Sequence, residues 1–303
     1  MNRLLVLTGL LALTAAPTPA LAQEVVGRHD ATLSISEVVS RGGWVRIASF
    51  NGPIDIAPTR GDRVEIRATK TMRRGSVEDI GFVVRREDGG VTVCAVYDDA
   101  DECDRDGHYR GHRDRGNRAP QGRVEFVVRV PDGVRIRAAS GNGDLRIGGT
   151  SQEVEASTGN GRIDISGSTG EVTASTGNGR LTIADAHGQV EASSGSGDVR
   201  VVTSDGPVSA HTGNGDIEVS MARLDGSPDM QFTTGNGRVT LELPEGYSAD
   251  LDATTGNGDV TSDFAIRTRG RLEHSRLRGT IGNGGGRLSI SSGNGDVEIR
   301  RRP

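Results

Sequence analysis

Residues 158–165 read Thr-Gly-Asn-Gly-Arg-Ile-Asp-Ile, and residues 176–183 read Thr-Gly-Asn-Gly-Arg-Leu-Thr-Ile. The two stretches begin 18 residues apart, and this motif or a Ser-containing variant begins at residues 140, 158, 176, 194 and 212. Further copies begin at residues 234, 255 and 292, and a variant Ile-Gly-Asn-Gly begins at residue 281. A fixed period of this kind indicates a stack of repeated structural units.

Each 18-residue unit divides into two halves of nine residues, and each half carries a glycine followed by alternating apolar residues. Ile163 and Ile165 are the apolar pair in one half, and Val172 and Ala174 are the pair in the next. Alternation with a period of two predicts β-strands with one buried face. Glycine suits the corners between them because it adopts positive φ. The expected corner residues are Gly143, Asn160, Gly161, Asn178, Gly179, Gly197, Asn214 and Gly215.

Two all-β topologies agree with this pattern. An antiparallel meander or sandwich is one, because Asn-Gly between apolar runs is a hairpin signal. Its intervening turns, however, would place Ser168-Thr169 or Ala186-His187 at positions that require positive φ. The 18-residue shift instead aligns Ala with Ala and Asn with Asn, as in parallel in-register stacking. We therefore predict a parallel β-solenoid with two short strands per coil, right-handed because parallel crossovers usually are.

Three segments are expected along the chain. Residues 1–22 resemble a secretory signal peptide, with Arg3, an apolar run and an Ala-Leu-Ala cleavage site. Residues 23–130 are predicted to form irregular β-rich coils with a charged loop at 97–120. Residues 131–303 are predicted to form regular solenoid coils that become less regular from about residue 220. We expect export to the periplasm, the cell surface or the medium, and no transmembrane helix in the mature chain.

Two cysteines, Cys94 and Cys103, remain after the expected cleavage. An even number of cysteines in an exported chain favours a disulfide between them. The following loop carries a run of acidic residues, a run of arginines, and His108 and His112. We expect a solvated loop held by the disulfide. Metal binding by the two histidines, or contact with a partner, is the less favoured alternative.

Four glutamates, here called the acidic stripe, are expected to point outward from one sheet: Glu153, Glu155, Glu171 and Glu191. They could form a ligand face or supply the carboxylates of a glycosidase, but sugar-binding aromatic residues are nearly absent from the array. A solvated acidic face is the favoured interpretation. The Gly-Asn-Gly corners lack the aspartate of calcium-binding nine-residue repeats, so we predict a ladder of asparagine amides there. The sequence predicts no catalytic residue, cofactor or metal ligand.

The repeated Thr-Gly-Asn-Gly units, the lead-in Pro131-Asp132-Gly133-Val134 and the stretch 51–56 resemble a bacterial family known as "putative adhesins" with β-strand repeats. The resemblance covers most of residues 40–300 and implies a β-solenoid. It implies adhesion only by association with the family name, and it brings no catalytic residues. The loop at 97–120 and the wider spacings after residue 215 depart from the family pattern.

These observations predict an exported, non-enzymatic, adhesin-like module that binds an unknown protein, a glycan or a second copy of itself. One alternative is a glycan-binding or polysaccharide-degrading β-helix protein, and another is a periplasmic accessory subunit. The formal net charge of −5 over 303 residues disfavours nucleic acid as a partner.

Overall fold

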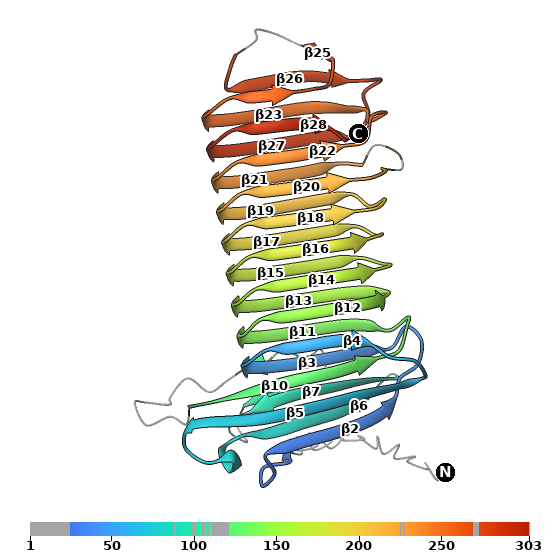
Figure 1. Ribbon diagram of the computed structural model, residues 1–303, viewed down its shortest axis with the longest axis vertical. Helices are drawn as coiled ribbons and strands as arrows, with labels where there is room; N and C mark the ends of the chain where they lie inside the picture. The colour runs from blue at the N-terminus through green and yellow to red at the C-terminus, as the bar shows by residue number, and fades with distance from the viewer. Residues whose placement is uncertain are drawn as a thin grey trace, which may run out of the picture.

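The computed structural model describes residues 25–87, 89–97, 101–104, 107, 109–110, 121–224, 226, 228–268 and 273–302. The expected signal peptide and most of the charged loop lie outside these residues. Two long sheets, here called sheet A and sheet B, run side by side along the molecule, with a broader N-terminal cap at one end (Figure 1). Each coil contributes one strand to each sheet.

The regular coils are built as the 18-residue repeat predicts. Val154 pairs with Val172 and Val172 with Val190, in parallel and in register. The parallel β-solenoid is thereby confirmed, and the antiparallel alternative is wrong for these coils. The coils, each written as its sheet A strand and then its sheet B strand, are β11 (Arg135–Asn142) and β12 (Leu145–Ser151), β13 (Glu153–Asn160) and β14 (Ile163–Ser168), β15 (Val172–Asn178) and β16 (Leu181–Ala186), β17 (Val190–Ser196) and β18 (Val199–Thr203), and β19 (Val208–Asn214) and β20 (Ile217–Met221).

The core lies between the two sheets and follows the alternation in the sequence. Val172, Ala174 and Leu181 are buried, whereas Thr173 between the first two is exposed. Small alanines recur once per coil in sheet A, and larger aliphatic residues fill sheet B. One continuous apolar cluster therefore extends through the stack although aromatic residues are only 3% of the chain.

The stack of parallel coils includes residues that precede residue 131, where the sequence predicted its start. Strands β3 (Trp44–Asn51) and β4 (Ile54–Pro58) form a coil that pairs in parallel with β11 and β12. Beyond this coil, sheet A continues with β7 (Gly90–Val96), β6 (Gly81–Glu87) and β1 (Val25–Val26). Sheet B continues with β10 (Gln121–Val130), β5 (Arg63–Arg74) and β2 (Thr32–Val38). A short 3-10 helix at Val77–Asp79 and the pair β8 (Glu102–Cys103) and β9 (Tyr109–Arg110) complete the cap.

The C-terminal coils do not follow the order of the sequence. The coil β21 (Met230–Asn236) and β22 (Val239–Leu243) is followed in space by the last coil, β27 (Arg287–Asn294) and β28 (Val297–Arg301). Only then comes the earlier coil β23 (Ala249–Asn257) and β24 (Val260–Ser262), as the colours of Figure 1 show. Sheet A ends with β26 (Arg276–Ile281) and β25 (Ile266–Thr268), which pair antiparallel.

The Ile-Gly-Asn-Gly variant at residue 281 is not a coil corner, so its interpretation as a repeat is wrong. Ile281 ends the antiparallel strand β26, and the glycines after it form the turn into β27. Gly282 and Gly284 there have φ values of 57° and 80°, unlike the 155° of the corner residue Gly179.

Candidate functional site

The eight expected corner residues all lie where a sheet A strand passes into the following sheet B strand. The φ values of Gly161 and Gly179 are 157° and 155°, in the range that favours glycine. A Cβ atom on Gly179 would also overlap the carbonyl oxygen of Gly161 in the neighbouring coil. Glycine is therefore required at this corner both by φ and by the distance between coils.

Asparagine amides form a ladder along these corners. The Nδ2 groups of Asn142, Asn160 and Asn178 donate hydrogen bonds of 2.8 Å to Oδ1 of the asparagine in the preceding coil, ending at Asn51. Ser196 interrupts the ladder, which resumes from Asn214. The corner asparagines are thus occupied with one another, in the arrangement expected of a structural ladder.

A second ladder of hydroxyl groups lies inside the corners. Thr158 Oγ1 donates to the carbonyl oxygen of Gly143 and Thr176 Oγ1 to that of Gly161, each at 3.0 Å. Both threonines are 5% exposed, and buried hydroxyl groups need such partners. The recurring Ser or Thr of the motif therefore bonds one coil to the next.

Two residues of the acidic stripe lie beside arginines. Glu153 and Glu155 lie next to arginines of the preceding coil, at 3.9 and 2.6 Å from the guanidinium groups of Arg135 and Arg137. Thr173 stands between Glu155 and Glu191 in the register of the sheet. Glu171 and Glu191 are exposed. The stripe is a partly neutralised outer face.

The expected disulfide between Cys94 and Cys103 is present, with a Cα–Cα distance of 6.2 Å. It closes a loop that contains Tyr97 and the fully buried Asp101, whose Oδ2 accepts a 2.8 Å bond from the Tyr97 N–H. His108 and His112 lie outside the described residues, and so does most of the loop. Among the described residues, no group of three or more His, Cys, Asp or Glu side chains is arranged to hold a metal ion.

The ring of Tyr97 is held from two further sides. It stacks on Phe50 with 3.7 Å between ring centroids. Its hydroxyl donates to the carbonyl of Gly122 at 2.9 Å and accepts from the Gly122 N–H at 3.0 Å. The ring therefore has a fixed position at the boundary between the cap and the stack.

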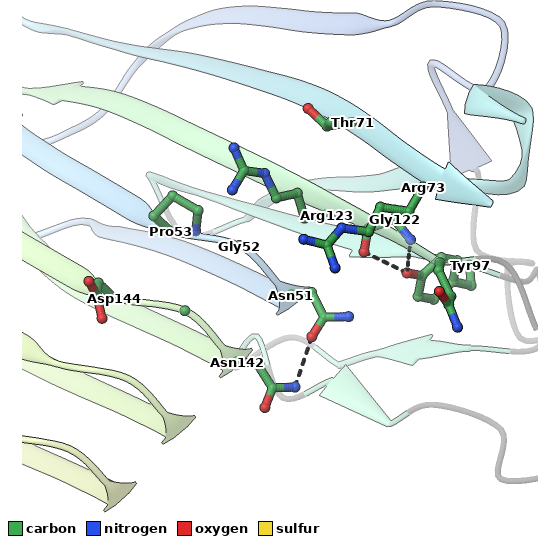
Figure 2. A pocket seen from close by; sticks show the side chains of 12 residues that line it. Asn51, Gly52, Pro53, Thr71, Arg73, Tyr97, Gly122, Arg123, Asn142 and Asp144 are labelled. Atoms are coloured by element: carbon green, nitrogen blue, oxygen red, sulfur yellow. Dashed lines mark hydrogen bonds between the residues drawn. The ribbon is translucent and has the colours of Figure 1, made fainter. Parts of the chain in front are cut away.

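Tyr97 forms part of the wall of a cavity of about 930 Å³ between the N-terminal cap and the first corners of the stack (Figure 2). We call this cavity the junction groove. Strands β5 and β10 supply one side, and the corners after β3 and β11 supply the other. Its lining residues are Asn51, Gly52, Pro53, Thr71, Arg73, Tyr97, Gln121, Gly122, Arg123, Asn142, Gly143 and Asp144.

Two arginines supply positive charge to the junction groove. Arg123 and Arg73 reach into it from β10 and β5 (Figure 2). Gln121 pairs with Arg74 and Gly122 with Met72, so Arg73 is the extra residue of a β-bulge. A bulge redirects the side chain of the extra residue, and bulges are common beside functional sites.

The sequence did not predict the junction groove, although it predicted the corners beside it. Asn51, Arg73 and Arg123 come from three separate strands, Tyr97 directly follows β7, and the four residues share no local motif. One sequence signal could have indicated this region. Asn51-Gly52 is an incomplete copy of the corner motif, and it marks the first coil. The structure brings none of the four acidic-stripe residues into the groove.

Similar solved structures include a "putative adhesin" from Bacteroides fragilis, at 11% identity and a TM-score of 0.46, covering 88% of this chain and 96% of that one. Another "putative adhesin", from Parabacteroides merdae, has 12% identity and a TM-score of 0.35, covering 90% and 96%. No curated protein matches the chain. No helix within the described ranges has the length and apolar character to cross a membrane.

The sequence also matches the family described as Toastrack DUF4097, over residues 100–300. These residues include every regular coil and the C-terminal coils. The resemblance expected from the repeated motif is confirmed. Because the match spans well over half of the chain, this protein belongs to the Toastrack DUF4097 family.

Proposed function

We propose that this protein is an exported, non-enzymatic binding module of the cell envelope or surface, and that it binds its ligand in the junction groove. The observation that carries this proposal is the convergence of Arg73, Arg123 and the Asn51 amide on one cavity. The surrounding frame is held by the Tyr97 contacts and by the corner ladder. A preorganised cavity whose walls are mostly apolar, with a few polar groups directed into it, is typical of a ligand site.

The carboxylates of the groove support a binding role over a hydrolytic one. Glycan hydrolysis ordinarily requires two carboxyl groups on opposite sides of the scissile bond. Among the described lining residues, Asp144 is the single carboxylate, and its Oδ1 accepts a 2.8 Å bond from the Arg162 N–H. Binding requires no second acid, so the groove is chemically sufficient for recognition.

The architecture supports a presenting role for the stack. Parallel coils extend from the groove toward the C-terminal end of the molecule (Figure 1). Neighbouring coils are bonded by backbone and hydroxyl ladders, and by the asparagine ladder except where Ser196 interrupts it. A stiff stack of this kind would hold the groove at a distance from whatever contacts the far end.

The proposal is tested by blocking the groove without disturbing the stack. The purified mature chain, with an expected N-terminus at Gln23, is applied to immobilised envelope glycans and proteins. Thr71→Trp fills the groove from an exposed position, and Thr261→Trp places the same ring on exposed Thr261 of β24, at the opposite end.

We expect the native chain and Thr261→Trp to retain the same ligand, with its covalent structure unchanged after incubation. Thr71→Trp should lose it. If the Thr71→Trp variant bound as well as the native chain, the ligand site would lie elsewhere. If the ligand were cleaved, the non-enzymatic assignment would be wrong.

A further inference from the structure

We infer that the junction groove recognises the carboxylate of an acidic glycan, with Arg73 and Arg123 as its charged contacts. This inference rests on the proposed function, because it names the ligand class of the same groove. Three observations support it: two arginines with no side-chain partner among the described residues, a free amide donor at the end of the asparagine ladder, and an apolar wall next to these groups.

The two guanidinium groups are available to a ligand. Neither Arg73 nor Arg123 makes an ion pair or a side-chain hydrogen bond with any described residue. By contrast, Arg137, Arg180 and Arg200 on the stack are each paired with a carboxylate of an adjacent coil. Arginine is suited to carboxylates because its planar group can donate two parallel hydrogen bonds.

The asparagine ladder ends at the same groove with a donor group. Each amide from Asn178 to Asn142 donates toward the N-terminal end, so Asn51 accepts through Oδ1 and has its Nδ2 group left over. Figure 2 shows the Asn51 oxygen turned to Asn142 and its nitrogen turned away. Chains of hydrogen bonds polarise one another, which strengthens the terminal donor. A carboxylate or a sugar oxygen is the matching acceptor.

The remaining walls fit a sugar ring. Tyr97 and Pro53 contribute apolar surface, and the Tyr97 ring is fixed by its contacts with Phe50 and Gly122. Thr71 supplies a hydroxyl group, and Asp144 supplies a carboxylate that can accept from sugar hydroxyl groups. Arginines for the acid, polar groups for hydroxyls and a ring for the apolar face are together the chemistry that an acidic sugar requires.

The topology disfavours an extended acidic peptide in this position. A peptide that binds by strand addition needs a free sheet edge. Strand β5 lies between β2 and β10, and β10 lies between β5 and β4. Strand β3 likewise has β7 and β11 on its two sides. The strands that line the groove therefore offer no edge, and recognition must come from side chains.

Calorimetry with the full mature chain tests the assignment. The probes are oligomers of galacturonic acid, hyaluronan oligomers and sialyllactose, with methyl-esterified galacturonate oligomers as the uncharged match. Sulfated dextran and poly-glutamate serve as other anions. The double variant Arg73→Gln/Arg123→Gln is compared with Arg67→Gln/Arg129→Gln, which removes the same charge from exposed positions on the same two strands outside the groove.

At least one carboxylated glycan should bind, and its dissociation constant should rise by about tenfold or more in Arg73→Gln/Arg123→Gln. The Arg67→Gln/Arg129→Gln variant should bind as the native chain does, and the methyl ester should not bind. Equal binding of the ester, or stronger binding of sulfated dextran or poly-glutamate, would overturn the assignment. So would the absence of binding by every carboxylated probe.

The two proposals fail in different ways. If a neutral ligand bound and Thr71→Trp abolished that binding, the groove would remain the site and only the acidic class would be wrong. If Thr71→Trp left the binding of every ligand intact, the proposed function would be wrong as well.

Discussion

Single residues at the corners carry the strongest local constraints of this protein. Gly161 and Gly179 have little room for a Cβ atom because the backbone of the preceding coil passes close to them. The Thr or Ser two residues before the corner Asn, as in Thr176, is buried with its hydroxyl bonded to a carbonyl of the neighbouring coil. Each residue of the motif therefore has a separate structural task, which explains why the motif recurs with the coil.

Gly179→Ala should destabilise the stack by more than about 2 kcal/mol, because a Cβ would overlap the Gly161 carbonyl at a φ that disfavours alanine. Urea unfolding followed by circular dichroism measures the loss. Gly246→Ala is the matched control, since Gly246 is exposed and has open space at the Cβ position. Similar midpoints for the two variants would contradict this account of the corner.

Lys70 is a buried charged residue whose position the sequence did not predict. It occupies an inward position on β5, where a strand pattern predicts an apolar side chain. Its Nζ donates to the carbonyls of Gly27 and Val77 and lies 5.3 Å from the centre of the Phe82 ring. Burial lowers its pKa below the ordinary value. Gly27 is distant from Lys70 in the sequence and Val77 lies beyond the end of β5, so the strand pattern indicated neither partner.

Whole strands were predictable because their signal is repeated. The apolar alternation of β13 returns in β15, β17 and β19, and the 18-residue shift aligns them in parallel. The cap strands have no such repetition. Strands β5 and β10 pair antiparallel, and β25 and β26 do so at the other end. Antiparallel strands thus extend the N-terminal end of both sheets and the C-terminal end of sheet A, whereas sheet B ends with the parallel strand β24.

An ion pair links β23 and β26 in the C-terminal cap. Arg278 donates two hydrogen bonds to Asp252, at 2.8 and 2.7 Å, and these bonds lower the pKa of Asp252 from its ordinary 3.8. A lowered carboxyl pKa stabilises the fold above the unfolded-state value, and the contribution is lost as pH falls below it. Because both side chains are substantially exposed and screened by solvent, we expect this contribution to be small.

Hydrogen exchange in β26 measures this contribution. Near neutral pH, Arg278→Gln should exchange faster than the native chain, and Arg278→Lys should lie between them because it keeps the charge without the two parallel bonds. The difference should vanish well below pH 3.8, where Asp252 is protonated in every variant. A difference that persisted there would show that Arg278 acts through packing.

At the scale of the whole molecule, the last coil in the sequence lies between two coils that precede it in the chain. Ile290 of β27 pairs with Phe232 on one side and with Ala253 on the other. Residues 287–301 therefore fill a place that two earlier coils leave between them. The segment before it is Gly-Asn-Gly-Gly-Gly at residues 282–286, whose flexibility permits the chain to turn back into the stack.

A chain truncated after residue 286 should lose hydrogen-exchange protection in β21 to β24, because both neighbours of the missing coil would expose apolar side chains. Protection in β3 to β13 should be unchanged, since the stability of a stacked array depends mainly on adjacent units. Mass spectrometry of exchanged peptides measures both regions. Unchanged protection in β21, or equal loss along the whole stack, would contradict this view of the last coil.

The sequence by itself determined the parallel stack, the corners and the disulfide partners, because each depends on a local signal or on a period repeated along the chain. Tertiary structure alone decided the position of the last coil and the junction groove. The corners of β21, β23 and β27 carry the same motif, so the motif does not say which coil lies next to which. The groove arises where an antiparallel cap meets the first corners, and its arginines converge only through long-range packing.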